Sequence, residues 1–250
     1  MSTPPDGTPL VLLNAFPVDR SQWEGLIAEL ADIVHGDIIA FDIPGIGEMP
    51  MTEEEPSLEL IADAAVVAMR EATGHDAAVW VGCSMGGYIA MAVAEREPTA
   101  VAGLGLIGTR ATADDAAGAA KRLEIARTVE DAERHPNPRQ VAEDLIGTQG
   151  ERRPALVSAI EANVATHSGA GIAWGQRAMA ARPDRTEVLR TVDAPAVVVI
   201  GENDGLVPRA DAEAMAAALG VEPVVLTGIG HLAAFEAPDA VARALAPLFE

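Results

Sequence analysis

Residues 77–88 read AAVWVGCSMGGY, and this stretch decides how the rest of the chain is interpreted. An apolar run of strand length ends at Val81, the pattern Gly-x-Ser-x-Gly follows at residues 82–86, and residues 87–96 have helical spacing of apolar side chains. A strand that turns sharply into a helix crowds the residues two before and two after its corner, so both are glycine. The pattern predicts that Ser84 is a nucleophile presented at the carboxyl edge of a sheet.

Cys83 is the rival nucleophile and the single cysteine of the chain. The register places Ser84, not Cys83, between the two glycines, so we interpret Cys83 as a small buried residue. One cysteine cannot form an internal disulfide, and residues 1–7 contain neither a basic start nor an apolar stretch. We therefore expect a cytoplasmic location.

Strand and helix patterns alternate on both sides of the pentapeptide. Short β-rich apolar runs suit strands buried on both faces, and longer segments between them have apolar residues at helical spacing. The predicted strands are 10–13, 37–41, 77–81, 101–107, 196–200 and 223–226. The predicted helices beside them are 21–31, 57–73, 87–96, 209–219 and 238–248. This alternation predicts an α/β fold with a mostly parallel sheet of about six strands and helices on both faces.

The alternation lapses between residues 110 and 190, where the sequence is rich in alanine and charged residues. Proline and glycine breakers divide this block into helix-like stretches. The stretches are 116–134, 138–145, 153–167 and 173–181. We interpret residues 110–190 as an inserted helical cap, and residues 1–109 and 191–250 as the α/β core.

The 250-residue chain has 17 basic and 38 acidic residues and a formal net charge of −21. The negative charge of the protein would repel the phosphate groups of nucleic acids and of anionic membranes. This disfavours both as partners. No apolar run approaches the ~18 residues that a spanning helix needs. The sequence therefore predicts no nucleic-acid or membrane partner, and it leaves the oligomeric state open.

A serine hydroxyl needs an adjacent base, and the chain offers five histidines. Of these, His231 has the right setting, because it ends a glycine-rich loop, residues 227–231, that directly follows the last predicted strand. Two others precede strands, which places them at the opposite edge, and two fall in the cap, where we expect surface positions. These four are His35, His75, His135 and His167. No pair has the spacing of metal ligands.

The pentapeptide and its strand and helix flanks, with the turns at 201–204 and 228–231, resemble the α/β-hydrolase superfamily over nearly the whole chain. The resemblance is to serine-nucleophile members with a helical cap, of the esterase and enol-lactonase kind. It implies that Asp204, in a Gly-x-x-Asp turn, orients His231, with Glu202 as the rival. The resulting order, Ser84 then Asp204 then His231, is the order expected on this fold.

Acyl transfer also needs donors for the developing oxyanion. The backbone N–H of Met85, which follows the nucleophile, is one candidate. The resemblance implies that the second is the N–H of Phe16, in a turn after the first strand that looks like His-Gly-x-Pro. This chain has Asn14 and Ala15 where His and Gly are usual, and we expect the Asn14 side chain to tie the loop together by hydrogen bonds.

The leading hypothesis is a serine hydrolase that cleaves a small carboxylic ester or lactone through an acyl-enzyme, with no metal or organic cofactor. Related members use the same residues for carbon–carbon bond hydrolysis or cofactor-free perhydrolysis, and a non-catalytic small-molecule binder is the alternative of another class. The expected partner is a small-molecule acyl substrate. A pocket between cap and sheet would set its identity. Candidate lining residues are Trp174, Met179, Leu206 and Leu232.

Overall fold

Six parallel strands form one sheet in the computed structural model, which describes residues 4–133 and 135–249. The strands are β1 (Leu10–Leu13), β2 (Ile38–Phe41), β3 (Ala78–Cys83), β4 (Val101–Ile107), β5 (Ala196–Gly201) and β6 (Val224–Leu226). Their order across the sheet is β2-β1-β3-β4-β5-β6. This confirms the predicted fold class. The carboxyl ends of the strands therefore lie at one edge, which the loops after β1, β3, β4, β5 and β6 share.

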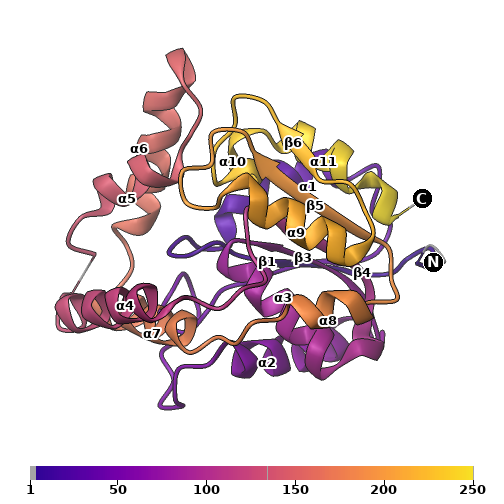
Figure 1. The fold of residues 1–250 in the computed structure, drawn as a ribbon, viewed down its shortest axis with the longest axis horizontal. Helices are drawn as coiled ribbons and strands as arrows, with labels where there is room; N and C mark the ends of the chain where they lie inside the picture. Colours follow the sequence, from indigo (N-terminus) through magenta and orange to yellow (C-terminus); the bar gives the residue numbers. More distant parts are fainter. Residues whose placement is uncertain (1–3, 134, 250) are drawn as a thin grey trace.

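Helices cover both faces of the sheet (Figure 1). They are α1 (Glu24–Leu30), α2 (Leu58–Thr73), α3 (Met85–Arg96), α8 (Thr186–Thr191), α9 (Arg209–Leu219), α10 (Ala233–Glu236) and α11 (Pro238–Leu245). Short 3-10 turns accompany them at Arg20–Trp23, Pro98–Ala100, Gly150–Arg152 and Ala246–Leu248. Alternate residues of β3 point to opposite faces, so that Trp80 packs with the helices of one side and Val79 with those of the other. Burial on both faces explains the continuous apolar runs.

Helix α2 illustrates how the sequence sets the bounds of a helix. The Ser57 hydroxyl accepts hydrogen bonds from the N–H groups of Glu59 and Leu60 at the start of the helix. At its end Gly74 adopts a left-handed conformation with φ 71°, and its N–H donates to the Arg70 carbonyl. A serine cap and a terminal glycine are readable signals, and the predicted helix agrees closely with the observed one.

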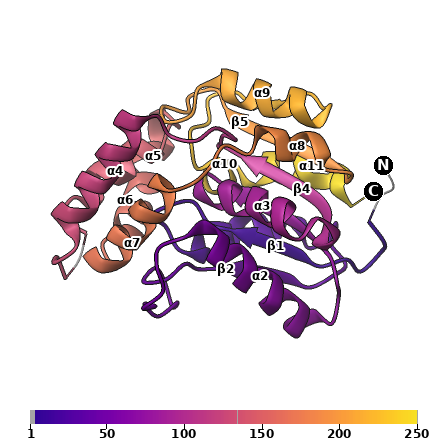
Figure 2. The same ribbon diagram turned by 60° about the horizontal axis from the view of Figure 1, so that its bottom comes forward.

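Four further helices lie together at one side of the sheet, opposite the chain ends (Figures 1 and 2). They are α4 (Ala116–Val129), α5 (Pro138–Leu145), α6 (Arg153–Val164) and α7 (Gly169–Ala180). α4 packs on α7 and α5 on α6, so the cap consists of two helix pairs. The predicted stretch 116–134 ends at Val129, and its last residue, Arg134, lies outside the described residues.

Helix α8 differs from the rest of the predicted cap range 110–190. It packs on α9 and α3 beside the sheet rather than on the four cap helices. The stretch predicted from residue 173 also begins earlier, at Gly169, because the Ser168 hydroxyl accepts the Gly171 N–H and caps the helix there. Within the described residues, no helix combines the length and apolar character needed to cross a membrane.

Candidate active site

Ser84 occupies the turn between β3 and α3 with φ 53° and ψ −113°. Among the described residues it is the one non-glycine with a positive φ. A Cβ added at Gly82 would lie 2.2 Å from the Gly86 carbonyl oxygen, and one added at Gly86 would lie 1.9 Å from the Leu13 carbonyl oxygen. Neither position can hold a side chain. The crowding that the Gly-x-Ser-x-Gly spacing predicts is therefore present, and the strained backbone is held by its surroundings.

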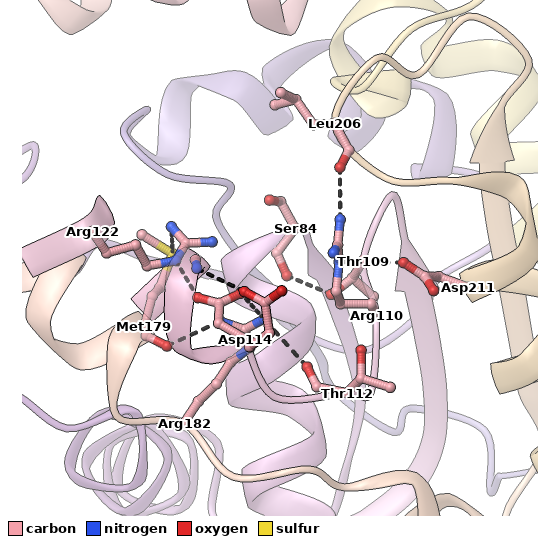
Figure 3. Close-up of polar contacts among 12 residues, drawn as sticks. Ser84, Thr109, Arg110, Thr112, Asp114, Arg122, Met179, Arg182, Leu206 and Asp211 are labelled. Carbon is pink, nitrogen blue, oxygen red and sulfur yellow. Dashed lines mark hydrogen bonds and ion pairs between the residues drawn. The ribbon is translucent and has the colours of Figure 1, made fainter. Parts of the chain in front are cut away.

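Two contacts from the end of the neighbouring strand β4 fix this corner. The Ser84 N–H donates to the Ile107 carbonyl oxygen at 2.9 Å, and the Thr109 hydroxyl donates to the Ser84 carbonyl oxygen at 2.7 Å (Figure 3). Gly87 faces the same threonine, because a Cβ there would lie 2.5 Å from Thr109 Cγ2. Backbone strain at a nucleophile persists only where such contacts over-determine the conformation.

Asp204 and His231 form a buried hydrogen-bonded pair. Asp204 follows β5 and His231 follows β6, and His231 Nδ1 lies 2.9 Å from Asp204 Oδ2. The two side chains are 1% and 2% exposed. The other carboxylate oxygen, Oδ1, accepts the N–H groups of Leu206 at 2.8 Å and Val207 at 3.0 Å. A carboxylate acceptor places the imidazole proton on Nδ1, which leaves Nε2 as the basic nitrogen.

Ser84 and His231 line one cavity of about 730 Å³ between the sheet edge and the cap. Of the four lining residues expected from the sequence, Met179 and Leu206 line this cavity. The other two do not: Trp174 and Leu232 are 3% and 1% exposed and pack in the two hydrophobic cores on either side of the sheet. Apolar character alone cannot distinguish a core side chain from a pocket side chain, which is why these two expectations were wrong.

The two amides expected to bind an oxyanion belong to Phe16 and Met85. Neither N–H has an acceptor within residues 4–133 and 135–249. The Phe16 loop is tied down by Asn14, whose Nδ2 donates to Asp42 Oδ1 at 2.9 Å and whose Oδ1 accepts from Trp23 Nε1 at 2.8 Å. This is the side-chain bonding expected of Asn14.

Sequence reasoning missed Gly108, which follows β4. Its φ is 51°, and a Cβ there would lie 3.0 Å from the His231 carbonyl oxygen and 3.2 Å from Asp204 Oδ2. The signal for Gly108 is its position at the carboxyl end of the strand between those that carry Ser84 and Asp204. A lone glycine after a strand is common, so the pattern alone did not single it out.

Sequence reasoning also missed Glu236, a glutamate with no exposed surface. Its Oε2 accepts three backbone N–H groups, from Gly147 at 3.1 Å, Thr148 at 2.7 Å and Gly230 at 3.1 Å. Its Oε1 is buried and has no partner among the described residues. One carboxylate thus joins the cap segment after α5 to the loop that carries His231. An isolated acidic residue in a helical pattern gives no sign of this role.

The remaining histidines divide by position. His35 and His75 are exposed at the opposite edge, as expected, and His35 pairs with Asp6. His135 is half-buried and lines the cavity. His167 was expected at the surface but is 3% exposed, and burial holds its pKa below the ordinary value against the opposing effect of Asp19 and Asp42. In the described ranges, no three His, Cys, Asp or Glu side chains gather as metal ligands would.

Cys83 is completely buried next to the nucleophile. Burial raises the pKa of its thiol far above the ordinary value, and the negative charges of Asp204 and Glu236 raise it further. The thiolate is the reactive form of cysteine, so this environment makes Cys83 unreactive.

A group of ion pairs lies on the cap side of Ser84 (Figure 3). Asp114 accepts hydrogen bonds from Arg122 Nε at 2.5 Å and Arg182 Nη2 at 2.7 Å. Burial alone would raise the pKa of Asp114, but these hydrogen bonds and charges outweigh it and lower the pKa to about 2. Arg182 is buried and also stacks over the Tyr88 ring, with its guanidinium carbon 4.2 Å from the ring centroid.

Comparisons with known proteins agree with this fold. Residues 8–238 match the family model described as alpha/beta hydrolase fold. A pimeloyl-[acyl-carrier protein] methyl ester esterase from Methylococcus capsulatus is 29% identical over 232 residues, which are 84% of this chain and 82% of the relative.

Two solved structures extend the likeness to the whole architecture. A thermophilic esterase from Thermogutta terrifontis, solved with malate bound, has a TM-score of 0.87 and 29% identity, and the match covers 100% of this chain and 93% of that one. The enol-lactonase from Burkholderia xenovorans LB400 has a TM-score of 0.83 at 22% identity, covering 98% and 92% of the two chains, and at this identity it supports the fold alone. The chain belongs to the alpha/beta hydrolase fold family and is a hydrolase.

Proposed function

We propose that the protein hydrolyses small carboxylic esters or lactones through an acyl-enzyme formed on Ser84. The observation that carries the proposal is the buried hydrogen bond of 2.9 Å between His231 Nδ1 and Asp204 Oδ2, in a histidine that lines the same cavity as Ser84. Nucleophilic catalysis requires a base that a carboxylate holds in one tautomer and a hydroxyl that this base can reach. The shared cavity and the strained turn at Ser84 support such an arrangement.

In the proposed first step, Ser84 Oγ attacks the ester carbonyl carbon while His231 Nε2 takes the hydroxyl proton. The carbonyl oxygen becomes an oxyanion, which the unoccupied N–H groups of Met85 and Phe16 stabilise. When the tetrahedral intermediate collapses, the bond to the alcohol oxygen breaks and His231 returns its proton to that oxygen. Asp204 stabilises the imidazolium through Nδ1 and stays ionised.

In the second step, water replaces the alcohol. His231 Nε2 takes a proton from the water as its oxygen attacks the acyl carbon, and the Ser84 oxygen leaves with that proton. The products are a carboxylic acid and the regenerated enzyme. For a lactone the alcohol stays attached to the acid, and the same steps apply.

A cytoplasmic location is part of the proposal and rests on the sequence alone.

Turnover of a short-chain chromogenic ester tests the proposal. Ser84→Ala should lower kcat by about 10⁴-fold or more, because the nucleophile and its base act as one unit. Cys83→Ala is the matched control, since it changes the adjacent buried residue, and it should retain turnover. A serine-directed phosphonate should add one adduct at Ser84. Equal turnover by the wild type and Ser84→Ala, or labelling elsewhere, would refute the assignment, and stoichiometric binding without turnover would favour a binder.

A further inference from the structure

The cap wall of the cavity carries two basic side chains, Lys121 and Arg122 of α4. Acidic residues outnumber basic ones by 38 to 17, and most arginines of the described chain pair with a carboxylate. Lys121 is the single lysine of the sequence. Within residues 4–133 and 135–249 its ammonium has no hydrogen bond or ion pair. An unpaired cation at the wall of a cavity is unusual in a chain with so many acids.

Arg122 has a carboxylate partner, but it shares that partner with a second arginine. Asp114 accepts from both Arg122 and Arg182, so one negative charge faces two guanidinium groups. Arg122 Nη1 contacts Gln176 Oε1 at 3.2 Å, whereas Nη2 has no acceptor in the described part of the chain. The Arg122 side chain extends from α4 toward Ser84 (Figure 3). The group formed by Arg122, Arg182 and Asp114 therefore has a net positive charge, and its Arg122 has a free donor at the cavity.

Asp114 lines the cavity as well, and two further carboxylates must be weighed against these cations. They are Glu124 of α4 and Asp144 of α5, and both residues are exposed. Asp144 already accepts a hydrogen bond from Gln140 Nε2 at 2.8 Å. Water screens exposed charges, whereas the Arg122 side chain is 25% exposed and is held in place by Asp114. The partly buried guanidinium therefore dominates the electrostatics of the inner wall.

We propose that the cavity binds esters that carry a carboxylate away from the reacting carbonyl. Arg122 and Lys121 bind this remote carboxylate. Arg122 Nη2 donates a charge-assisted hydrogen bond to this carboxylate, and the Lys121 ammonium neutralises it from the more exposed side. The proposal rests on the proposed function, because it assumes that the reacting carbonyl lies at Ser84 while the remote group reaches α4. It names a substrate class, short half-esters of dicarboxylic acids or esters of hydroxy acids.

The kinetic test compares esters that differ in the remote group. Methyl hydrogen glutarate against methyl pentanoate places the carboxylate on the acyl side, and 4-acetoxybutanoate against butyl acetate places it on the alcohol side. In at least one pair, kcat/KM should favour the carboxylate by about tenfold, the value of one charge-assisted hydrogen bond in a partly buried site. The pair that shows the preference identifies the side. Equal kcat/KM values within both pairs would overturn the proposal.

Variants then assign the preference to named side chains. Arg122→Gln should bring the ratio close to one, Arg122→Lys should restore part of it, and Lys121→Met should lower it about threefold, as expected of an exposed cation. The matched control is Arg127→Met, which removes a cation from an exposed position of the same helix that does not line the cavity. Its ratio should equal that of the wild type. Loss of the ratio in Arg127→Met to the same extent would mean that general charge is responsible.

Binding to Ser84→Ala separates this proposal from the proposed function. Calorimetric titration with methyl hydrogen glutarate or 4-acetoxybutanoate should give, for at least one of them, a Kd about tenfold below that of its neutral counterpart. In the same background Arg122→Gln should remove this difference and Lys121→Met should reduce it about threefold. Such binding without hydrolysis by the wild type would support the carboxylate site and refute the hydrolytic proposal. Ser84-dependent hydrolysis of neutral esters with no carboxylate preference in rate or binding would refute the site alone.

Discussion

The two ends of the cavity are built by different means. At the sheet edge, the positions of Ser84, Asp204 and His231 are fixed by strand ends, buried hydrogen bonds and glycines that leave no room for a side chain. At the cap, α4 and α5 present mostly exposed polar side chains, of which Arg122 is held by an ion pair with Asp114. At the sheet edge, the side chains can move little from their positions. At the cap, substitutions of the exposed side chains disturb the fold less. This difference is why the sheet edge indicates a reaction class, whereas the choice of substrate by the cap stays a proposal.

The largest effect on stability is expected where the two ends are joined, at Glu236. Glu236→Ala would leave the buried N–H groups of Gly147, Thr148 and Gly230 without their acceptor. We expect the free energy of unfolding to fall by about 3 kcal/mol, measured by urea denaturation at pH 7. Glu236→Gln keeps a carbonyl oxygen for these amides and should recover part of the loss.

Glu202→Ala is the matched control for Glu236. Glu202 Oε2 also accepts an amide of the His231 loop, that of Gly228 at 2.9 Å, but its side chain is exposed. Its loss should cost less than about 0.5 kcal/mol, because water replaces the missing acceptor. Equal destabilisation by Glu202→Ala and Glu236→Ala would contradict a special role for the buried carboxylate.

A smaller effect, on activity, is expected at Gly108. In Gly108→Ala the new methyl group lies against the His231 backbone and Asp204 Oδ2, so the pair must shift by a few tenths of an ångström. We expect kcat/KM to fall about thirtyfold on a chromogenic ester, because catalytic groups act only within a narrow range of positions. Gly74→Ala is the control, since it imposes alanine at a similar φ of 71° where a Cβ meets nothing within 4 Å.

Gly74→Ala should lose only stability, by about 1 kcal/mol, with kcat/KM unchanged. If both glycine variants lose activity equally, the loss reflects backbone strain in general. If Gly108→Ala keeps wild-type kcat/KM, the sheet edge tolerates more movement than the comparison of the two cavity ends implies.

The smallest effect is expected at the cap, from Asp114. Its pKa of about 2 lies below the ordinary 3.8, so the ionised carboxylate stabilises the fold above about pH 4, and this contribution disappears as the pH falls through about 2. Asp114→Asn should therefore lower the free energy of unfolding by about 1 kcal/mol at pH 6. The difference from wild type should narrow between pH 4 and pH 2, and a difference independent of pH would contradict the ionic role.

The sequence allowed prediction of the sheet and of which side chains would gather at its edge, for one physical reason. Each of Ser84, Asp204 and His231 follows an apolar run, and the carboxyl ends of parallel strands meet. The structure confirms the fold and brings the last two into contact, while the catalytic role of the three stays a prediction. The local signals were strong because a tight turn forces glycine at fixed spacing, as at Gly82 and Gly86.

What could not be predicted depends on contacts between distant segments. Glu236 lies 88 residues from its partner Thr148, and Arg182 lies 68 residues from Asp114. No local pattern marks such pairs. Trp174 and Leu232 failed as pocket residues for the same reason, since their neighbours are set by tertiary packing. The proposed role of Lys121 and Arg122 in α4 also could not be predicted, because the sequence does not show which cations lack a carboxylate partner.

The backbone of the proposed base is bonded to the cap, since the His231 N–H donates to the Leu145 carbonyl oxygen at 3.2 Å, and Asn203 Nδ2 donates to the Gly147 carbonyl oxygen at 3.2 Å. An engineer who wished to graft a foreign lid onto this enzyme could not treat the lid as a detachable module. A transplant that replaces residues 145–148 would also have to redesign the loop that carries His231. Exchange of α4 alone would leave the hydrogen bonds between that loop and the cap intact.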